Sequence, residues 1–313
     1  MASIEELKQL SILEVAESLG MQLHRTGSHT YAWQEHDSFT INTRDNYFNW
    51  FARSTGGDVI KMVQVVQEET SGQAISFKQA KHFLEDGSFD VVDVTAIPEK
   101  EPFHYYLEPS ETEFKEGREY LKDVRGLSDE TIDFFAEKGV LSQATKKTGD
   151  YFEPVLVFKS LDTQNEIIGA SLQGIRENLD LYERGRLKQI MRASDGLTGM
   201  HVDIGTPSRL IFAEAPIDLM SYYELKKDTL KDVRLVAMDG LKESTVSRHV
   251  AELLSEVGEL NGEVDQEKKS SFLADMARVT TFFEDGKHQD LITLAVDNDE
   301  AGQSAAKRIS DKL

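Results

Sequence analysis

The chain has 313 residues, no cysteine and a formal net charge of −21. Its length predicts two or three domains with a buried core. The absence of cysteine excludes disulfides, thiolate nucleophiles and cysteine-bound zinc. A simple nucleic-acid binder needs a surplus of lysine and arginine on the contacting face. Any contact with nucleic acid must therefore be local, bridged by metal or helped by a partner.

Neither a membrane span nor a secretion signal is evident. No stretch approaches the roughly 20 consecutive apolar residues of a spanning helix. The N-terminal "MASIEELKQL" lacks the basic and apolar regions of a signal peptide. We therefore expect a cytosolic protein without a membrane partner.

Residues 1–88 form the first predicted region. An amphipathic pattern over 3–20 predicts one helix with Gly20 at its C-terminal end. A turn at 44–46 separates two alternating segments. The two strand segments are 31–41 and 46–52. Two further helices are predicted at 56–69 and 76–86. Residues 89–104 are acidic, contain two prolines and lack helical period, so they are the predicted linker.

Residues 105–206 form the second predicted region. Helices are expected at 116–125 and 128–140, the second with Ser128 as its N-cap. A hairpin is expected over 151–176. A basic cluster then interrupts the acidic chain, and its members are Arg184, Arg186, Lys188 and Arg192. Composition alone favours a solvated surface for this cluster.

Residues 207–313 alternate apolar runs with helical patterns. Such alternation is typical of an α/β fold with a parallel sheet covered on both faces. Ligands of such sheets bind at the carboxyl ends of the strands. Acidic residues follow three of the predicted strands at these ends. Glu214 and Asp218 follow the first, Asp239 follows the second, and Asp297 and Asp299 follow the last.

Carboxylate oxygens gathered without His or Cys suit Mg²⁺ or Mn²⁺. Phosphoryl or nucleotidyl transfer is the chemistry that such a site supports. Acidic residues also stabilise helix N-termini without any metal. Capping is the favoured interpretation for Asp218 or Glu300 taken alone, whereas a metal site is favoured for Glu214, Asp297 and Asp299 taken together.

Three segments carry a family resemblance. "LIFAEAPIDLMSYYEL", "VAMDGLK" and "LAVDNDEAGQSAAKRI" resemble the TOPRIM domain of bacterial DnaG-type primases, topoisomerases and some nucleases. Glu214, Asp218, Asp297 and Asp299 occupy the acidic positions of that domain. The resemblance implies that all four hold Mg²⁺ or Mn²⁺ and that Glu214, Asp297 and Asp299 are catalytic. Ala215-Pro216 stands where the family usually has Gly, which lets backbone approach a site closely.

The resemblance extends upstream of the TOPRIM-like segments. "LVFKSLDTQNEIIGASLQGI" and "LKQIMRASDGLTG" are similar to the primase segments that precede TOPRIM and contact the nucleotide. This similarity implies an α+β region like the primase core over 105–206. The residues expected to contact nucleotide or nucleic acid are Arg184, Arg186, Lys188, Arg192 and Lys242.

The N-terminal region resembles the zinc-ribbon domain of the same primases. The four positions that hold zinc in that family read Trp33, His36, Trp50 and Arg53 in this chain. His36 alone cannot supply the four ligands that zinc takes. We therefore expect a small α+β domain without zinc, with both tryptophans in its core. Arg53 and Tyr47 are left as candidates for DNA contact.

The order of these regions most resembles the primase-like TOPRIM proteins of conjugative plasmids and related mobile elements. It implies synthesis of RNA primers from NTPs on single-stranded DNA, with a helicase or relaxase as partner. A TOPRIM nuclease, with Glu214 as general acid or base, and a non-catalytic DNA-processing adaptor are the alternatives. The family's sheet continues beyond the last helix, so the chain is expected to be a fragment or an unusually short domain. The stretch between Gly240 and Asp297 is expected to hold two helices instead of one.

Overall fold

The computed structural model describes residues 2–53, 55–92, 102–182, 184–260 and 290–310, with residues 269, 272, 273 and 288. The chain divides into two compact units, Met1–Lys100 and Glu101–Leu313. Most of the predicted linker, and most of the second helix expected between Gly240 and Asp297, lie outside the described residues. The domain boundaries expected at 88, 104 and 206 stay predictions. No helix in the described part of the chain combines the length and apolar character needed to cross a membrane.

The first unit packs helices against a five-stranded antiparallel sheet in the order β1-β2-β3-β4-β5. Its helices are α1 (Ile4–Lys8), α2 (Ile12–Ser18), α3 (Val59–Ser71) and α4 (Phe77–Asp86). Its strands are β1 (Leu23–Arg25), β2 (Thr30–Trp33), β3 (His36–Asn42), β4 (Tyr47–Trp50) and β5 (Thr55–Gly57), with a 3-10 turn, η1, at Phe51–Arg53. The predicted strand 46–52 and the predicted helices 56–69 and 76–86 correspond to β4, α3 and α4, whereas the predicted segment 31–41 is two strands, β2 and β3. The sequence did not predict β1 or β5. Both tryptophans are 2% exposed, which confirms that they belong to the core.

The single N-terminal helix predicted from periodicity is wrong, because the chain breaks between α1 and α2. Ser11 caps α2 by accepting the backbone N–H of Glu14. Asn46 fills the break from the turn before β4, since its amide donates to the carbonyls of Lys8 and Leu10 at 2.9 and 2.8 Å. Its Oδ1 accepts the N–H of Ile12 at 2.9 Å. These contacts satisfy backbone groups that a continuous helix would otherwise satisfy.

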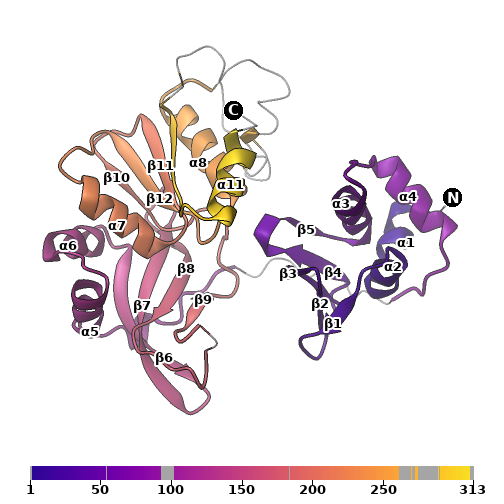
Figure 1. Ribbon diagram of the computed structural model, residues 1–313, viewed down its shortest axis with the longest axis horizontal. Helices are drawn as coiled ribbons and strands as arrows, with labels where there is room; N and C mark the ends of the chain where they lie inside the picture. The colour runs from indigo at the N-terminus through magenta and orange to yellow at the C-terminus, as the bar shows by residue number, and fades with distance from the viewer. Residues whose placement is uncertain are drawn as a thin grey trace. The chain divides into compact units, whose positions relative to one another are not determined.

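The second unit contains two four-stranded sheets (Figure 1). The first is antiparallel in the order β6-β7-β8-β9, and the second has the order β10-β12-β11-β13. The strands are β6 (Leu141–Thr148), β7 (Tyr151–Leu161), β8 (Ile167–Gly174), β9 (Lys188–Ile190), β10 (His201–Ile204), β11 (Arg209–Ala213), β12 (Val233–Ala237) and β13 (Ile292–Ala295). The helices are α5 (Glu116–Glu119), α6 (Asp129–Glu137), α7 (Pro216–Lys226), α8 (Glu243–Glu256) and α11 (Glu300–Ser310), with a 3-10 turn, η2, at Glu108–Ser110.

The last sheet is mixed and not purely parallel. β11 lies between β12 and β13 and runs parallel to both, whereas β10 pairs antiparallel with β12 at the edge. Along β11, Ile211 and Ala213 pack toward α7, while Leu210 and Phe212 pack toward α8 and α11. Successive side chains of a strand point to opposite faces, so the apolar run of β11 is covered by helices on both sides. β10 was missed because its four residues carry no long apolar run.

The helix predicted over 116–125 is not a regular α-helix along its whole length. α5 continues directly into a π-helical turn, η3, at Tyr120–Val124. The wider turn buries Tyr120 and Leu121 and ends at Arg125, before Gly126 with φ of 73°. Such π-turns are rare and often lie at functional sites. The helix predicted at 128–140 is confirmed as α6, with Ser128 as its N-cap.

Candidate functional site

The three parallel strands of the last sheet end in register. Ala213 of β11 lies opposite Ala237 of β12 and Ala295 of β13. Glu214, Asp239 and Asp297 therefore follow these strand ends by one or two residues, at the same edge of the sheet. A hydrogen bond of 2.9 Å from Gly240 N–H to the Glu214 carbonyl fixes the β12 end beside the β11 end. This edge is where ligands of such sheets bind.

The carboxylates at this edge influence one another. Burial, followed by the charges of Asp297, Asp218 and Asp299, raises the pKa of Glu214 above its ordinary value. Burial and the charge of Asp297 likewise raise the pKa of Asp218, despite the opposing effect of Arg125. Burial is thus the largest cause of both raised pKa values, and neighbouring carboxylates add to it, while Lys188 and Arg125 offset part of the rise. Such carboxylates are typical of sites that bind a positively charged ligand.

Asp299 has a structural role besides its place in the acidic group. Its Oδ1 accepts the N–H of Gly302 at 2.8 Å, so it caps the N-terminus of α11. Gly302 is required here, because a Cβ at this position would lie 2.0 Å from the Asp297 carbonyl oxygen. Asp218 lies in the first turn of α7, where a negative charge is favourable to the helix start. Capping is therefore an observed role of Asp299, and ligand binding by this group stays a prediction.

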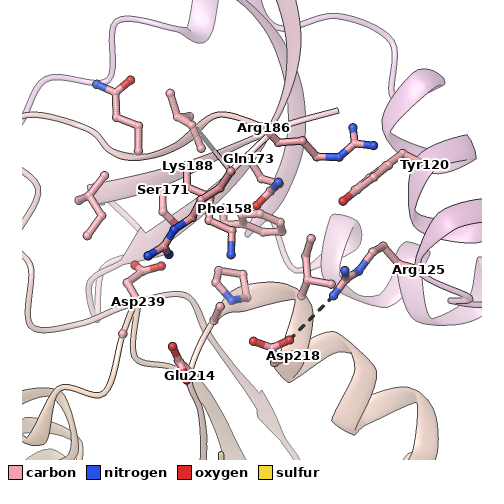
Figure 2. A pocket seen from close by; sticks show the side chains of 18 of the residues that line it. Tyr120, Arg125, Phe158, Ser171, Gln173, Arg186, Lys188, Glu214, Asp218 and Asp239 are labelled. Carbon is pink, nitrogen blue, oxygen red and sulfur yellow. Dashed lines mark ion pairs between the residues drawn. The ribbon is translucent and has the colours of Figure 1, made fainter. Parts of the chain in front are cut away.

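A cavity of about 550 Å³ joins this acidic edge to the neighbouring antiparallel sheet (Figure 2). Glu214 and Asp239, which follow strand ends, and Asp218 of α7 line one wall. Asp297 and Asp299 are not among the side chains that line the cavity. Basic side chains line the other walls, namely Arg125, Arg184, Arg186 and Lys188. Lys188 is close enough to lower the pKa of both Glu214 and Asp218. Because cations and carboxylates lie on facing walls, the cavity suits a ligand whose phosphate groups meet the cations while a bound divalent metal would meet the carboxylates.

Arg125 is the functional candidate that the sequence did not reveal. Its guanidinium lies 4.0 Å from Asp218 Oδ1, across the cavity from Lys188 (Figure 2). Arg186 is held nearby, because it donates to the Ile175 carbonyl and stacks over the Tyr120 ring with its Cζ 5.1 Å from the centroid. A pattern of period 3.6 cannot predict the π-turn that places Arg125. The Arg125-Gly126 pair at the helix end was the available signal.

Two of the predicted nucleotide-binding residues are not among the side chains that line the cavity. Arg192 is exposed and follows β9. Lys242 reaches the Gly196 carbonyl at 3.4 Å, and burial lowers its pKa. The structure thus brings Arg184, Arg186 and Lys188 to the acidic edge and leaves Arg192 and Lys242 outside it.

The donor set fits a hard divalent cation. In the part of the chain that is described, no three His, Asp or Glu side chains approach closely enough to form a ready metal-binding group. Mg²⁺ is usually held by one or two carboxylates and completes its shell with water and phosphate oxygens. Glu214 and Asp297 could supply such direct ligands, with Asp218 and Asp299 acting through water.

The four positions of the predicted zinc ribbon converge in the first unit, together with Glu69 of α3. We call this group the aromatic cluster: Trp33, His36, Trp50, Arg53 and Glu69. The Arg53 Cζ lies 4.2 Å from the Trp50 ring centroid, and its guanidinium pairs with Glu69. His36 Nε2 lies 3.3 Å from the same carboxylate, and its ring packs against both tryptophans. Arg53 is therefore engaged within the unit, which weakens its candidacy for DNA contact.

Comparison with known proteins agrees with the TOPRIM-like pattern. Residues 211–313 match the Toprim-like family model. An uncharacterized protein of Bacillus anthracis, pXO2-78, is 28% identical over 309 residues, covering 98% of this chain and 78% of the relative.

Two solved primases are similar to the chain in outline. The zinc-binding and RNA polymerase domains of the Aquifex aeolicus primase are 14% identical, covering 100% of this chain and 77% of that one, with a TM-score of 0.35. The primase fragment of the bacteriophage T7 primase-helicase protein is 14% identical, covering 88% of this chain and 81% of that one, with a TM-score of 0.36. These TM-scores are too low to align the side chains of the site.

Proposed function

We propose that this protein, which carries a Toprim-like domain over residues 211–313, is a primase-like nucleotidyltransferase that makes RNA primers on single-stranded DNA. The observation that carries this proposal is the single cavity in which carboxylates at the ends of parallel strands face a cluster of arginine and lysine. A nucleoside triphosphate needs both kinds of group, since its phosphates bind cations directly and bind carboxylates through a divalent metal.

The residues of the acidic edge and of the cavity have separable roles in this proposal. Bound Mg²⁺ or Mn²⁺ would neutralise the triphosphate and polarise the phosphorus that is attacked. Glu214 and Asp297 would hold that ion, with Asp218 and Asp299 in support. Arg125, Arg184 and Lys188 would neutralise phosphate or the template strand directly. The reaction joins a primer 3′-hydroxyl to the α-phosphate and releases pyrophosphate, so catalysis is mostly positioning and charge stabilisation.

The basic wall of the cavity also bears on binding to single strands. Neutralising Arg184, Arg186 and Lys188 to glutamine should weaken binding of nucleotide or single-stranded DNA. Each lost phosphate contact should reduce the slope of log affinity against log salt by about 0.7. Arg192→Gln is the matched control, because Arg192 belongs to the same sequence cluster but is not among the cavity-lining side chains. An unchanged slope in the triple variant would mean that the basic cluster is only a solvated surface.

The biological setting of this activity is also a proposal. The resemblance to primase-like proteins of mobile elements suggests primer synthesis during plasmid replication or transfer. A helicase or relaxase would then supply the single strand. The net charge of −21 supports this view, because an acidic chain binds nucleic acid poorly without help from a partner.

The decisive assay measures incorporation of labelled NTPs into short RNA on a single-stranded template with Mn²⁺. Wild type should make primers and Asp297→Asn should not. Asp150→Asn is the matched control, since Asp150 is an exposed carboxylate of the turn between β6 and β7 and is not one of the carboxylates that act on Glu214. Nicking of supercoiled plasmid without primer synthesis would instead indicate a TOPRIM nuclease. DNA binding without either reaction would indicate an adaptor.

A further inference from the structure

Arg125 and Asp218 form an ion pair at one side of the cavity (Figure 2). The guanidinium Nη2 lies 4.0 Å from Asp218 Oδ1, and the two side chains are 39% and 40% exposed. Ion pairs that are this long and this exposed contribute little to stability, because water screens the charges. The pair is therefore an interaction that a ligand can replace with little loss of free energy.

The backbone on both sides of Arg125 is fixed, so a change of partner needs movement of the side chain alone. At the end of the π-turn, the Arg125 N–H donates to the Tyr120 carbonyl at 3.3 Å. Three residues further on, the N–H and Oγ of Ser128 donate to Glu224 of α7 at 3.0 and 2.7 Å. Asp218 lies on the same helix. These contacts hold the Arg125 backbone in a defined position relative to Asp218 while its guanidinium reaches the cavity.

Arg125 supplies part of the positive charge that the acidic edge needs. Burial and then the charge of Asp297 raise the pKa of Asp218, and the charge of Arg125 lowers it. A divalent cation among these carboxylates would compensate the same negative charge. Arg125 and such a cation are therefore alternative partners of Asp218. A guanidinium that leaves this carboxylate can form bidentate, charge-assisted hydrogen bonds with a phosphate, which are stronger than the long ion pair.

We propose that Arg125 exchanges Asp218 for a ligand phosphate when the acidic edge holds a divalent metal, and thereby makes the cavity select triphosphate that binds together with metal. This inference rests on the proposed function and extends it, because it makes metal binding and phosphate binding depend on each other. Such a dependence is reciprocal. Arg125 then has two opposite effects: it weakens the binding of metal alone and strengthens the binding of metal with triphosphate.

Calorimetric titrations of the full chain with Mn²⁺ alone and with Mn²⁺–ATP test the exchange in Arg125→Gln. Loss of a positive charge beside the carboxylates should tighten the binding of Mn²⁺ alone by about three- to tenfold. The same substitution should weaken the binding of Mn²⁺–ATP by about tenfold, because the lost contact to phosphate outweighs the gain at the metal. A merely structural role of Arg125 would not produce effects of opposite sign on the two ligands.

Two further variants separate the exchange from a general effect of charge or fold. Arg184→Gln is the matched control, because Arg184 lines the same cavity but is not among the groups that act most strongly on Glu214 or Asp218. It should weaken the binding of Mn²⁺–ATP and leave the affinity for Mn²⁺ alone unchanged. Arg125→Lys keeps the positive charge and should therefore restore the wild-type affinity for Mn²⁺ alone, while its single ammonium replaces the bidentate contact to phosphate only in part.

The outcomes distinguish a failure of the exchange from a failure of the proposed function. The exchange is overturned if Arg125→Gln binds Mn²⁺ alone no more tightly than wild type, or if Arg184→Gln tightens it equally. Full affinity of Arg125→Gln for Mn²⁺–ATP also overturns it. In each of these cases the proposed function stands, provided that wild type binds Mn²⁺–ATP. Absence of Mn²⁺–ATP binding by wild type removes both.

Discussion

The aromatic cluster of the first unit and the cavity of the second both gather charged groups around buried strand ends, but they treat charge in opposite ways. In the aromatic cluster, Arg53 is paired with Glu69 and stacked on Trp50. At the cavity, burial and then neighbouring carboxylates raise the pKa values of Glu214 and Asp218. The charge of Arg53 is thus compensated within the unit, whereas carboxylates with raised pKa values in a cavity are typical of candidate functional sites. The comparison therefore favours a structural role for the aromatic cluster and makes the cavity the functional candidate.

The largest effect should come from removing the centre of the aromatic cluster. Trp50→Ala should lower the free energy of unfolding of the first unit by about 3–5 kcal/mol, because it leaves a large cavity in the core. Urea denaturation monitored by Trp33 fluorescence measures this. Phe51→Ala is the control, since Phe51 is 64% exposed and should change stability by less than about 0.5 kcal/mol. A loss below about 1 kcal/mol for Trp50→Ala would contradict a structural role for the cluster.

Metal should stabilise the second unit and not the first. Mn²⁺ at a hundred times its Kd should raise the free energy of unfolding of the second unit by about 2.7 kcal/mol, through binding to the folded state alone. Glu214→Gln and Asp297→Asn should abolish this gain, while their metal-free forms stay folded because repulsion between carboxylates is relieved. Thermal unfolding with and without Mn²⁺ measures the shifts. The metal site would be refuted by equal shifts in wild type and variants.

Zinc provides the complementary control on the first unit. Elemental analysis should find no stoichiometric zinc, and chelators should leave its melting temperature unchanged, because three of the four ligand positions cannot bind zinc. Tight zinc at one ion per chain would contradict the replacement of a metal by the aromatic cluster.

The two roles of Asp299 can be separated by choice of substitution. Asp299→Ala should lower stability by roughly 0.5–2 kcal/mol whether or not metal is present, since it removes the cap on Gly302 N–H. Asp299→Asn should keep the cap, because asparagine caps helices about as well as aspartate. Loss of the Mn²⁺-induced shift in the asparagine variant, measured by thermal unfolding, would assign a metal role. A normal shift would leave Asp299 as a cap only.

The sequence predicts the parts of this molecule that depend on local patterns. Apolar runs locate β11, β12 and β13, and the residues after them locate Glu214, Asp239 and Asp297 at one sheet edge. This holds because the alternation of strand and helix and the position of strand ends are both local properties. The roles of these residues in metal binding and catalysis stay predictions.

The remaining features depend on contacts between residues far apart in the chain. The break between α1 and α2 is stabilised by Asn46, more than thirty residues away. Arg125 meets Asp218 only because the π-turn directs it into the cavity. Arg192 and Lys242 share the charge of the basic wall but not its position. No periodicity encodes such pairings, so charge and spacing alone could neither find Arg125 nor reject Arg192.

A smaller effect is expected from the ion pair of the aromatic cluster. Arg53→Leu should lower the stability of the first unit by about 0.5–1 kcal/mol, because the side chain is about half exposed and its interaction with Trp50 is partly screened. Much of this loss should disappear in a Glu69→Gln background, and a double-mutant cycle measures the coupling. Zero coupling would show that the cluster is held by its aromatic rings alone.

The smallest expected effect is the change of the free energy of unfolding with pH. The sign of this change identifies the carboxylates of the cavity. Burial and neighbouring carboxylates raise the pKa of Glu214 and Asp218, so the folded state holds their protons more tightly than the unfolded state does. The free energy of unfolding of the metal-free protein should therefore fall as pH rises from the ordinary carboxylate pKa through these raised values. Burial would raise the pKa of Glu224, but hydrogen bonds from Thr131 and Ser128 outweigh it and lower the pKa to about 2. Glu224 therefore changes the free energy of unfolding in the opposite direction, over a more acidic range.

Comparing wild type with Glu214→Gln isolates the cavity, because the variant lacks one carboxylate with a raised pKa and keeps Glu224. The stability of the variant relative to wild type should increase as pH rises through the raised pKa and then level off. A difference that is constant with pH would mean that Glu214 carries no uncompensated charge, and the contrast with the aromatic cluster would then be lost.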